Sequence, residues 1–411
     1  MNGTGGTVIT GIGVIAPNGL GTGSYWAAVQ DGVSGLGPIS RFDAANYPVR
    51  VAGEITDFFA DQHVPARLLP QTDRVTQLAL TATEWALRDA ELNPAQLPDY
   101  AMGTVTSTAA GGFEFGQRQL AKLWRDGAPF VSAYQSFAWF YAVNTGQISI
   151  RHGLRGHGSV VVTEQAGGLD AIGHARRLLR QGTASSMVTG GFDALQCPWG
   201  LVAQLPSGRL SEHGDPVTAY LPFDRAASGY VPGEGGAILV LEDTDQARDR
   251  GAPQRYGEVA GYAATFDPPA RSGRPATLAR AIRLSLADAG LHPEEIGVVF
   301  ADACAVAEQD RIEAEAITEV FGPGQIPVTA PKTTTGRLYA GGSALDVATA
   351  LLTLRTGVIP PTTAQGRTRS AYELDLVLGR RRRCHANAVL VIARGHGGFN
   401  SAMVLRKERH E

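Results

Sequence analysis

The chain has 411 residues, of which 44% are hydrophobic and 18% are charged, and its formal net charge is -3. This composition is typical of a globular protein with a well-buried core and excludes a largely disordered chain. The slight negative charge also disfavours nucleic-acid binding through a basic surface. No apolar run reaches the roughly 18 residues of a membrane span, and the N-terminus lacks the pattern of a secretory signal, so we expect a cytoplasmic protein.

The cysteines and glycines give no sign of a metal, a cofactor or a disulfide framework. Cys197, Cys304 and Cys384 show no Cys-x-x-Cys spacing, which argues against a disulfide scaffold and a zinc ribbon. The pair Cys384-His385 has no partner ligands, so no metal site is predicted. The glycines between Gly19 and Gly23 lack the context of a nucleotide site and are interpreted as turns.

Short apolar runs flanked by glycine or polar residues predict strands that are buried on both faces. In chain order these are Val8–Gly11, Met102–Thr106, Ser159–Thr163, Ser186–Gly190, Ala237–Glu242, Gly297–Ala301 and Ala388–Ala393. Segments with apolar residues at helical spacing lie between them. The alternation predicts a layered α/β architecture with helices between sheets.

Two pairs of similar segments recur in the same order along the chain. The helical pattern that ends in LRDAELNP (Leu87–Pro94) is echoed by the one that ends in LADAGLHP (Leu286–Pro293). Two further helices open with Ala-Gly-Gly, at 166–168 and 340–342. We therefore expect a duplicated α/β unit. A polar stretch at 243–254 suggests halves at residues 1–250 and 251–411.

The segment Ser159–Gly168 predicts a strand, a sharp turn and a helix. A residue at this turn lies at a helix N-terminus, where free backbone N–H groups and the helix dipole favour a thiolate or an oxyanion. The position therefore suits a nucleophile. The chain instead offers Glu164 and Gln165, and a carboxamide cannot attack an acyl group. Taken alone, Gln165 could equally cap the helix or satisfy a buried backbone group.

This segment resembles the active-site elbow of β-ketoacyl synthases of the thiolase fold, whose pattern is T-A-C-A-G-G-L-D-A. Gln165 stands where those enzymes have the nucleophilic cysteine. Matching segments extend over almost the whole chain: Gly11–Gly19, Thr72–Leu80, Tyr220–Asp243 and Gly397–Arg406. The resemblance implies an α/β protein with a thiolase-like fold, built of duplicated αβαβα layered units.

The other catalytic landmarks of that family are altered as well. Active members carry two histidines that assist decarboxylation and stabilise the enolate and the oxyanion. Asp302 and Arg337 occupy these positions here, while Lys332 is retained and two acidic positions of the pattern are matched by Asp310 and Glu313. Without the cysteine and both imidazoles, acyl transfer and decarboxylation lack their chemical groups. One structural interpretation is that Asp302 pairs with Arg337 across the former active site.

This combination resembles the chain-length factor, or ketosynthase-beta subunit, of bacterial type II aromatic polyketide synthases. The resemblance implies a non-catalytic subunit that forms a heterodimer with an active ketosynthase-alpha subunit and shapes the tunnel for the growing poly-β-ketone. The acyl carrier protein that carries the chain is the second implied partner. No cofactor, nucleic acid or membrane is implied.

Two other functions remain as alternatives. The first is a malonyl-carrier-protein decarboxylase that supplies the acetyl primer, because glutamine also occurs at the elbow of priming decarboxylase domains. Those domains keep their two histidines, and this chain does not. The second is a stand-alone acyl-binding or scaffold protein, which would require a stable monomer or homodimer.

By residue matching, the resemblance places tunnel-gating positions at Phe113, Gly116 and Leu120. It places the gate loop at Gly395–Gly398, where His396 stands in place of the phenylalanine of the G-F-G-G pattern of active enzymes. The spacing of the first three puts them on one face of a helix. Gly116 has no side chain, so we expect a wide tunnel and a product longer than an octaketide. The alternative is that Gly116 only allows close helix packing.

Two surface features leave alternatives open. The aromatic residues Phe137, Trp139, Phe140 and Tyr141 could fill a core or pack at a subunit interface. The run Arg380–Arg383 could recognise an acidic carrier protein or be a solvated loop.

Overall fold

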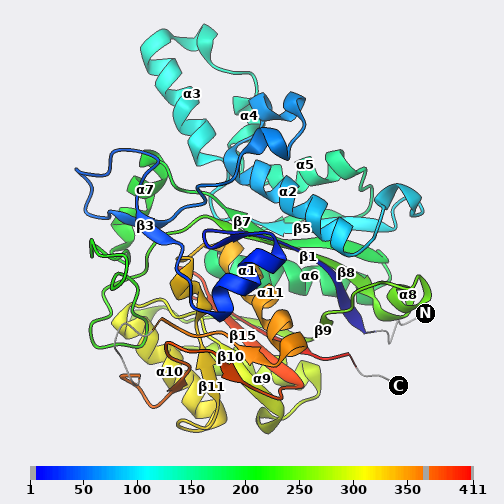
Figure 1. Cartoon of the computed structure of the whole chain (residues 1–411), viewed down its shortest axis with the longest axis vertical. Coiled ribbons are helices and arrows are strands. Elements are labelled where there is room, and N and C mark those ends of the chain that lie inside the picture. The colour runs from blue at the N-terminus through cyan, green and yellow to red at the C-terminus, as the bar shows by residue number, and fades with distance from the viewer. Residues whose placement is uncertain (1–5, 364–369, 409–411) are drawn as a thin grey trace.

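The computed structural model describes residues 6–363 and 370–408. Most of its strands form one sheet path that runs through both halves of the chain, and helices cover and separate the two parts of this path (Figure 1). The N-terminal part lies at the top of Figure 1 and the C-terminal part at the bottom, with α11 (Ala340–Thr356) between them.

The N-terminal part has the strand order β1-β8-β7-β5-β6. These strands span Thr7–Ala16 (β1), Gly235–Asp243 (β8), Ser186–Asp193 (β7), Met102–Ser107 (β5) and Gly158–Val161 (β6). β5 pairs in parallel with β6 and β7, whereas β8 is antiparallel to β7 and β1. The parallel strands therefore end on one side, at the edge where the elbow follows β6.

The C-terminal part repeats this arrangement strand by strand, in the order β9-β16-β15-β10-β11. These strands span Gly257–Phe266 (β9), Phe399–Arg406 (β16), Ala388–Arg394 (β15), Ile296–Phe300 (β10) and Pro327–Thr329 (β11). Again β10 is parallel to both neighbours, and β16 is antiparallel to both of its neighbours. The two parts meet where Val8 and Ile9 of β1 pair with Glu258 and Gly257 of β9.

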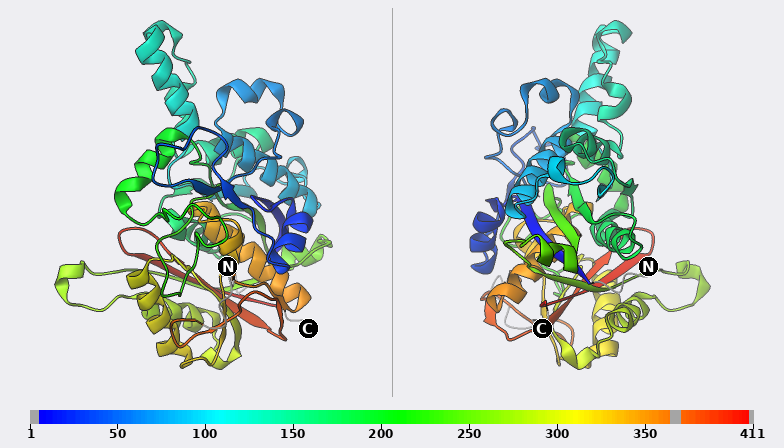
Figure 2. Two further views of the ribbon diagram at one scale, coloured as in Figure 1. Left: turned by 60° about the vertical axis from the view of Figure 1, so that its left-hand side comes forward. Right: turned by 90° about the vertical axis from the view of Figure 1, so that its right-hand side faces the viewer.

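The helices that cover the strands also correspond between the two parts. α6 (Gly167–Arg180) and α11 pack against each other and lie between the two parts of the sheet. α2 (Arg74–Asp89) covers the outer face of the N-terminal strands, and α9 (Leu278–Ala289) covers the outer face of the C-terminal strands. α5 (Val143–His152) adds to the first outer layer and α10 (Ala307–Phe321) to the second. The result is the five-layered αβαβα arrangement (Figure 2).

Three apolar cores fill the spaces between these layers. Neighbouring strand residues point into different cores, as the pleat of a strand requires. Leu239 of β8 lies in the central core with α6 and α11, and Val240 lies in the outer core under α2. In β15, Val391 points into the central core and Leu390 into the outer core under α9.

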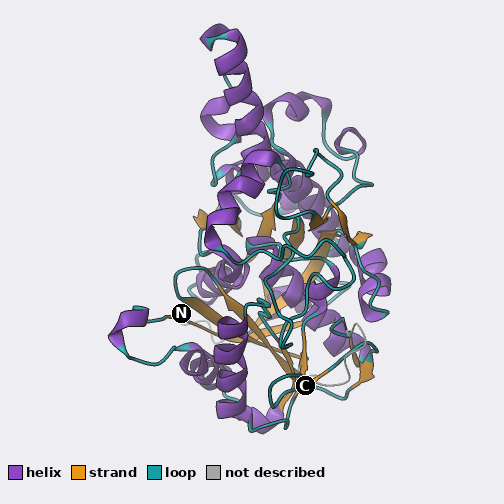
Figure 3. Ribbon diagram, turned by 90° about the vertical axis from the view of Figure 1, so that its left-hand side faces the viewer, coloured by secondary structure: helices purple, strands orange, loops and turns teal. Residues whose placement is uncertain are grey.

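The remaining elements connect or flank these layers, and Figure 3 colours the helices, strands and loops of the described residues. They are α1 (Thr22–Gln30), α3 (Phe113–Asp126), α4 (Gln135–Ala138), α7 (Pro198–Gln204), α8 (Thr244–Asp249), β2 (Gly19–Leu20), β3 (Leu36–Pro38), β4 (Val51–Gly53), β12 (Val358–Ile359), β13 (Asp375–Leu376) and β14 (Arg382–Arg383). Short 3-10 helices are Ala60–Gln62, Ala66–Gln71, Pro94–Gln96, Ala128–Phe130, Glu164–Ala166, Leu205–Ser207, Ala270–Ser272, Pro293–Glu295 and Pro331–Thr334. α3 projects from the body of the molecule (Figures 1 and 2).

The repeated Ala-Gly-Gly segments make close backbone contacts with neighbouring elements. A Cβ atom on Gly168 of α6 would lie 2.6 Å from the carbonyl oxygen of Ala340 in α11, and one on Gly341 would lie 2.0 Å from that of Gly235 at the start of β8. Real Cβ atoms do not approach so closely, so these positions need glycine. The duplication seen in the sequence is thus the duplication of two helices in contact.

The layered α/β prediction and the thiolase-like fold are confirmed, and each predicted strand is present. The expectation that all strands are buried on both faces is wrong for β6. This strand ends the sheet path and is half-exposed or exposed along its length, because no other strand among the described residues pairs with its outer edge. The boundary near residue 250 falls directly after α8, and we retain it as a proposal.

Candidate functional site

The elbow forms between β6 and α6. Glu164 has φ 52°, in the left-handed region that non-glycine residues rarely adopt. Gln165 follows and is fully buried. Its side chain faces α11, since a Cβ atom on Gly342 would lie 2.5 Å from Gln165 Nε2. Both polar atoms of this carboxamide lack a hydrogen-bond partner. The residue at the nucleophile position is therefore enclosed by the protein.

Asp302 and Arg337 form a buried ion pair, as the sequence suggested. Arg337 Nη1 lies 3.0 Å from Asp302 Oδ2. Asp302 also accepts a hydrogen bond from the backbone N–H of Arg394, and Arg337 donates one to the Arg394 carbonyl oxygen. Burial pushes the pKa of Asp302 up, but the Arg337 and Lys332 cations hold it below its usual value. Both groups are therefore charged at neutral pH.

Lys332 belongs to a second buried ion pair beside the first. Its Nζ lies 2.7 Å from Asp346 Oδ2 on α11 and donates a hydrogen bond to the carbonyl oxygen of Ala301, at 2.6 Å. The retained lysine thus connects the end of β10 to the central helix. Its contacts are structural in this chain.

Asp310 and Glu313, on the first two turns of α10, hold the loop that carries Asp302. Glu313 accepts hydrogen bonds from the backbone N–H groups of Asp302 and Ala303, and Asp310 accepts from Ala305 and Phe223. Ala303 and Ala305 have φ near 52° and 56°, so the loop needs such support. Burial raises the pKa of Asp310 to about 8 and that of Glu313 to about 7.

The gate loop rests on the elbow. The backbone N–H of His396 donates a 2.9 Å hydrogen bond to Glu164 Oε2. Glu164 Oε1 in turn lies 3.7 Å from Arg337 Nε. Since Arg337 also binds the backbone of Arg394, the ion pair links the gate loop to the elbow from two sides. Sequence reasoning noted Glu164 but did not identify this contact.

A pocket of about 430 Å³ remains above these residues. It is lined by Glu164, Ala203, Gln204, Pro206, Ser207, Arg209, Tyr230, Cys304, Arg337, Tyr339 and His396. Gln165 does not line it, so the nucleophile position has no contact with this space. Burial raises the pKa of the Cys304 thiol to about 12, which keeps it protonated at neutral pH.

The tunnel positions lie together on the first half of α3. Phe113 stacks on Trp199 with ring centroids 4.5 Å apart. Gly116 is buried beneath the same indole, where a Cβ atom would lie 2.8 Å from Trp199 Cζ3. Leu120 is 38% exposed. The sequence missed Trp199, because its place over α3 follows from the fold and not from a local pattern.

The two surface features have contrasting surroundings. Trp139, Phe140 and Tyr141 are each about two-fifths exposed in this chain, so they do not fill a core. In the arginine run, Arg381 pairs with Asp31 and Arg382 with Asp375, which neutralises part of its charge.

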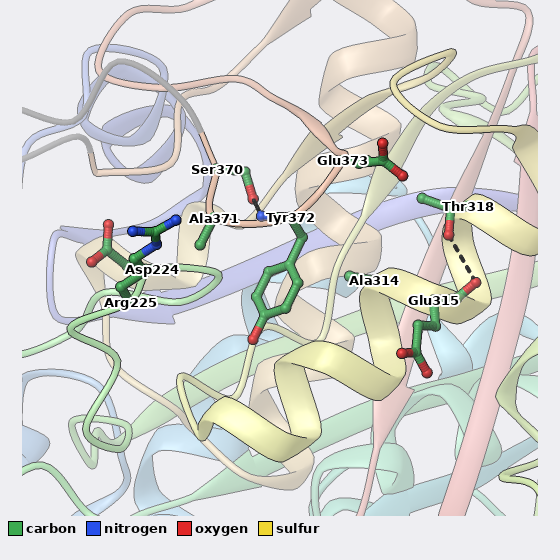
Figure 4. Close-up of a pocket in the computed structure, with 9 residues that line it drawn as sticks. All are labelled: Asp224, Arg225, Ala314, Glu315, Thr318, Ser370, Ala371, Tyr372 and Glu373. Atoms are coloured by element: carbon green, nitrogen blue, oxygen red, sulfur yellow. Dashed lines mark hydrogen bonds between the residues drawn. The ribbon is translucent and has the colours of Figure 1, made fainter.

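A separate pocket of about 710 Å³ lies beside α10 (Figure 4). None of the residues that line it belongs to the elbow. Tyr372 stands in its centre and donates a hydrogen bond to the Ala307 carbonyl oxygen. Neither Gln165 nor the Asp302–Arg337 pair contributes to it. Among the described residues, no cluster of His, Cys, Asp and Glu has the arrangement of a metal site. Within the same residues, no helix is long and apolar enough to span a membrane.

Comparison with known proteins identifies the family to which the chain belongs. The model of the β-ketoacyl synthase N-terminal domain matches residues 6–247, and that of the C-terminal domain matches residues 256–365. The chain is 62% identical to the tetracenomycin polyketide synthase ketoacyl synthase beta subunit of Streptomyces glaucescens, over 97% of this chain and 98% of that protein. It is 60% identical to the actinorhodin polyketide putative beta-ketoacyl synthase 2 of Streptomyces coelicolor, with the same coverage.

Solved structures of ketosynthases superpose on this chain over nearly its whole length. The ishigamide ketosynthase/chain length factor superposes with a TM-score of 0.88 at 29% identity, over 98% of this chain and all of that one. A type II acyl-carrier protein complex with its ketosynthase bound to the hexaketide gives 0.87 at 25% identity, with the same coverage. With its layered duplicated fold, its elbow without a nucleophile and these relatives, the chain belongs to the β-ketoacyl synthase family, in the ketosynthase-beta branch of type II polyketide synthases.

Proposed function

We propose that this chain is a non-catalytic chain-length factor that pairs with an active ketosynthase-alpha subunit and shapes the tunnel in which the poly-β-ketone grows. The observation that carries the proposal is the state of the elbow. Its nucleophile position holds an enclosed carboxamide, and the two histidine positions hold a buried ion pair. Neither arrangement supplies a nucleophile or a general base.

The ion pair also disfavours the decarboxylase alternative. Decarboxylation of a malonyl unit needs donors that stabilise the enolate. Asp302 is an anion at neutral pH, and Arg337 is already bound by Asp302 and by the Arg394 carbonyl oxygen. The Gln165 carboxamide faces α11 instead of the pocket. Neither the nucleophile position nor the two former histidine positions therefore offers a free donor for that chemistry.

The edge of the N-terminal strands supports heterodimer formation. Among the described residues no strand pairs with the outer edge of β6, and large apolar side chains are exposed on α3, in the segment 130–141, on α5 and directly after β6. We refer to these exposed residues together as the apolar surface: Leu120, Trp124, Phe130, Trp139, Phe140, Tyr141, Ile150 and Val162. Such surfaces are rare on monomers and mark interaction sites. A ketosynthase-alpha subunit with the same fold could extend the sheet through its own β6 edge.

The first half of α3 supports a role in length selection. Phe113 and Gly116 lie against Trp199, and Leu120, one turn further along α3, belongs to the apolar surface. The space beside Gly116 is filled by the indole in this chain, so the width here depends on the Trp199 side chain as well as on the missing side chain of Gly116. This contact fits the alternative that Gly116 allows close packing. The proposal of a product longer than an octaketide rests on the missing side chain of Gly116 and on Leu120, which is smaller than an aromatic residue.

The acyl carrier protein that delivers the chain is the second proposed partner, and we place the complex in the cytoplasm. The direct test is reconstitution of the ketosynthase-alpha subunit and the carrier protein with and without this chain, followed by mass analysis of the products. We expect polyketide of defined length only when all three are present. Malonyl-carrier decarboxylation by this chain alone would instead support the decarboxylase function.

A further inference from the structure

The Asp73 carboxylate lies between the N-termini of two helices. Asp73 is the N-cap residue of α2, and its Oδ1 accepts a 2.9 Å hydrogen bond from the backbone N–H of Val75. Its Oδ2 accepts a 2.7 Å hydrogen bond from the backbone N–H of Phe115, in the first turn of α3. The side chain is fully buried. One carboxylate thus caps its own helix and a second helix that begins 40 residues later in the sequence.

α3 has no side-chain cap of its own. Its N-cap residue is Gly112, which carries no hydrogen-bonding side chain. Gly112 also packs directly against Asp73, because a Cβ atom on Gly112 would lie 2.8 Å from Asp73 Cβ. Free N–H groups in the first turn of a helix need an acceptor. Asp73 supplies it from another element.

The rest of α3 has few attachments to the body of the protein. The helix projects outward in each view (Figures 1, 2 and 3), and Trp124 near its far end is 84% exposed. Besides Asp73, its first turns are held by the ion pair between Arg41 and Glu114, at 2.6 Å, and by Gln117, which accepts a hydrogen bond from the Trp199 backbone. The direction of α3 is therefore set at its N-terminal end.

We propose that Asp73 is a positioning residue for length selection, because it fixes the first turn of α3 and with it the placement of Phe113 and Gly116 against Trp199. The inference rests on the proposed function. Phe115, which Asp73 holds, lies two residues after one gate position and one residue before the other. A small change in the tilt of α3 therefore moves both gate positions relative to the indole.

Two substitutions separate this role from the capping of α2. Asparagine and serine cap helices about as well as aspartate does, so Asp73→Asn and Asp73→Ser should both keep the cap on Val75. Asp73→Asn has one acceptor oxygen for the two N–H groups, so when this oxygen caps Val75 the N–H₂ group faces the Phe115 N–H, a donor against a donor. Asp73→Ser is too short to reach Phe115. Asp73→Ser therefore removes the contact to α3 and spares α2, and Asp73→Asn keeps only one of the two contacts.

The experiment measures product lengths from the full complex of ketosynthase-alpha subunit, carrier protein and each variant. Size-exclusion chromatography first establishes that the heterodimer has assembled. We expect the share of products outside the main length to rise several-fold in both variants. Hydrogen exchange of the α3 first-turn amides should become faster by up to about tenfold, the factor expected for loss of one hydrogen bond.

A matched control is Asp243→Asn. Asp243 caps α8 through the backbone N–H groups of Asp245 and Gln246, and its side chain has no hydrogen bond to a second helix within the part of the chain that the structure describes. This variant should leave the product lengths unchanged. A second control, Gly116→Thr with Leu120→Phe, changes the gate directly.

The outcomes distinguish the inference from the proposed function. Faster exchange with unchanged product lengths, while the gate control does shift them, would overturn the role of Asp73 and leave the proposed function standing. Unchanged lengths in every assembled variant, including the gate control, would overturn both. Lower turnover at an unchanged length distribution would mean that Asp73 is only structural.

Discussion

The Arg337 guanidinium and the Asp302 carboxylate lie 3.0 Å apart. They occupy the two positions at which the pattern of active family members has histidines. Both side chains are almost fully buried. The pair occupies the former catalytic space with groups that satisfy each other. Both side chains also bind the backbone of Arg394, at the end of β15, and so hold the strand that leads into the gate loop.

Removing one partner of this pair should cost more than removing both. Asp302→Ala leaves a buried guanidinium without its anion, and we expect a loss of about 3–5 kcal/mol in the free energy of unfolding. The double variant Asp302→Ala with Arg337→Leu should lose less than Asp302→Ala alone, and therefore clearly less than the sum of the two single variants. Denaturant unfolding of the assembled heterodimer measures both values. Additive losses would show that the two charges are not coupled.

This chain should not become acylated, even when a thiol is restored at the elbow. Wild type lacks a nucleophile at Gln165, and Gln165→Cys would place a thiol in an enclosed site without an imidazole base. Intact-protein mass spectrometry after incubation with a labelled acyl-carrier thioester should show no adduct in either protein. A stable adduct on wild type would contradict the non-catalytic function.

A charge next to the β6 edge should prevent heterodimer formation. Val162 directly follows β6 and is 44% exposed, so Val162→Asp would bury a carboxylate in the proposed interface. Val33→Asp is the control, since Val33 is 53% exposed and follows α1 beside β1, away from the β6 edge. Analytical ultracentrifugation with the ketosynthase-alpha subunit should show assembly of the control and not of Val162→Asp. Normal assembly of both would place the interface elsewhere.

Filling the gate should shorten the product. Gly116→Thr must displace Trp199, because even the Cβ atom would lie 2.8 Å from its ring, and Leu120→Phe adds volume on the same helix face. We expect shorter polyketides at comparable turnover, measured by product mass. Lys122→Gln, on the exposed part of α3, is the control and should keep the wild-type length. An unchanged length in an active complex of the double variant would exclude these positions as the gate.

The stability of the fold should fall as the pH rises from about 6.5 to 8. Burial raises the pKa of Asp73 to about 7, of Asp193 to about 7, of Asp310 to about 8 and of Glu313 to about 7. The folded chain therefore binds more protons than the unfolded chain in this range, so the free energy of unfolding decreases with pH.

The predicted decrease in the free energy of unfolding begins near pH 6.5, because below this pH the titration of His152 changes that free energy in the opposite direction. Burial lowers the pKa of His152 to about 4, so its contribution to stability grows as the pH rises toward its ordinary value of about 6.5. Denaturant unfolding of the heterodimer at several pH values between these limits measures the slope. A free energy of unfolding that increases across the window would show that the carboxylates are already ionised in the folded state.

The sequence predicted the layers of the fold because they depend on local patterns. Apolar runs marked the strands, and the repeated Ala-Gly-Gly segments marked α6 and α11, whose close contact needs glycine. It also predicted that Asp302 and Arg337 could pair, since both replaced residues of one site. The exposure of β6 was missed, because a strand at the end of a sheet has the same apolar residues as a central strand.

Other parts of the site could not be read from the sequence, because they join residues that are distant along the chain. The contact between Asp73 and Phe115 spans 42 positions, and the stacking of Trp199 on Phe113 depends on where α7 lies against α3. Likewise, Gln165 was placed correctly at the elbow, but its orientation toward Gly342 follows from the packing of α6 on α11. Such contacts carry no periodic signal.

The open edge of β6 ties the cellular supply of this chain to that of its proposed partner. A copy made in excess presents an unpaired strand and the apolar surface to other proteins, which favours aggregation and proteolytic removal. A copy in the heterodimer hides both. The amount of the chain that persists in a cell should therefore follow the amount of ketosynthase-alpha subunit, whatever the rate at which each is synthesised.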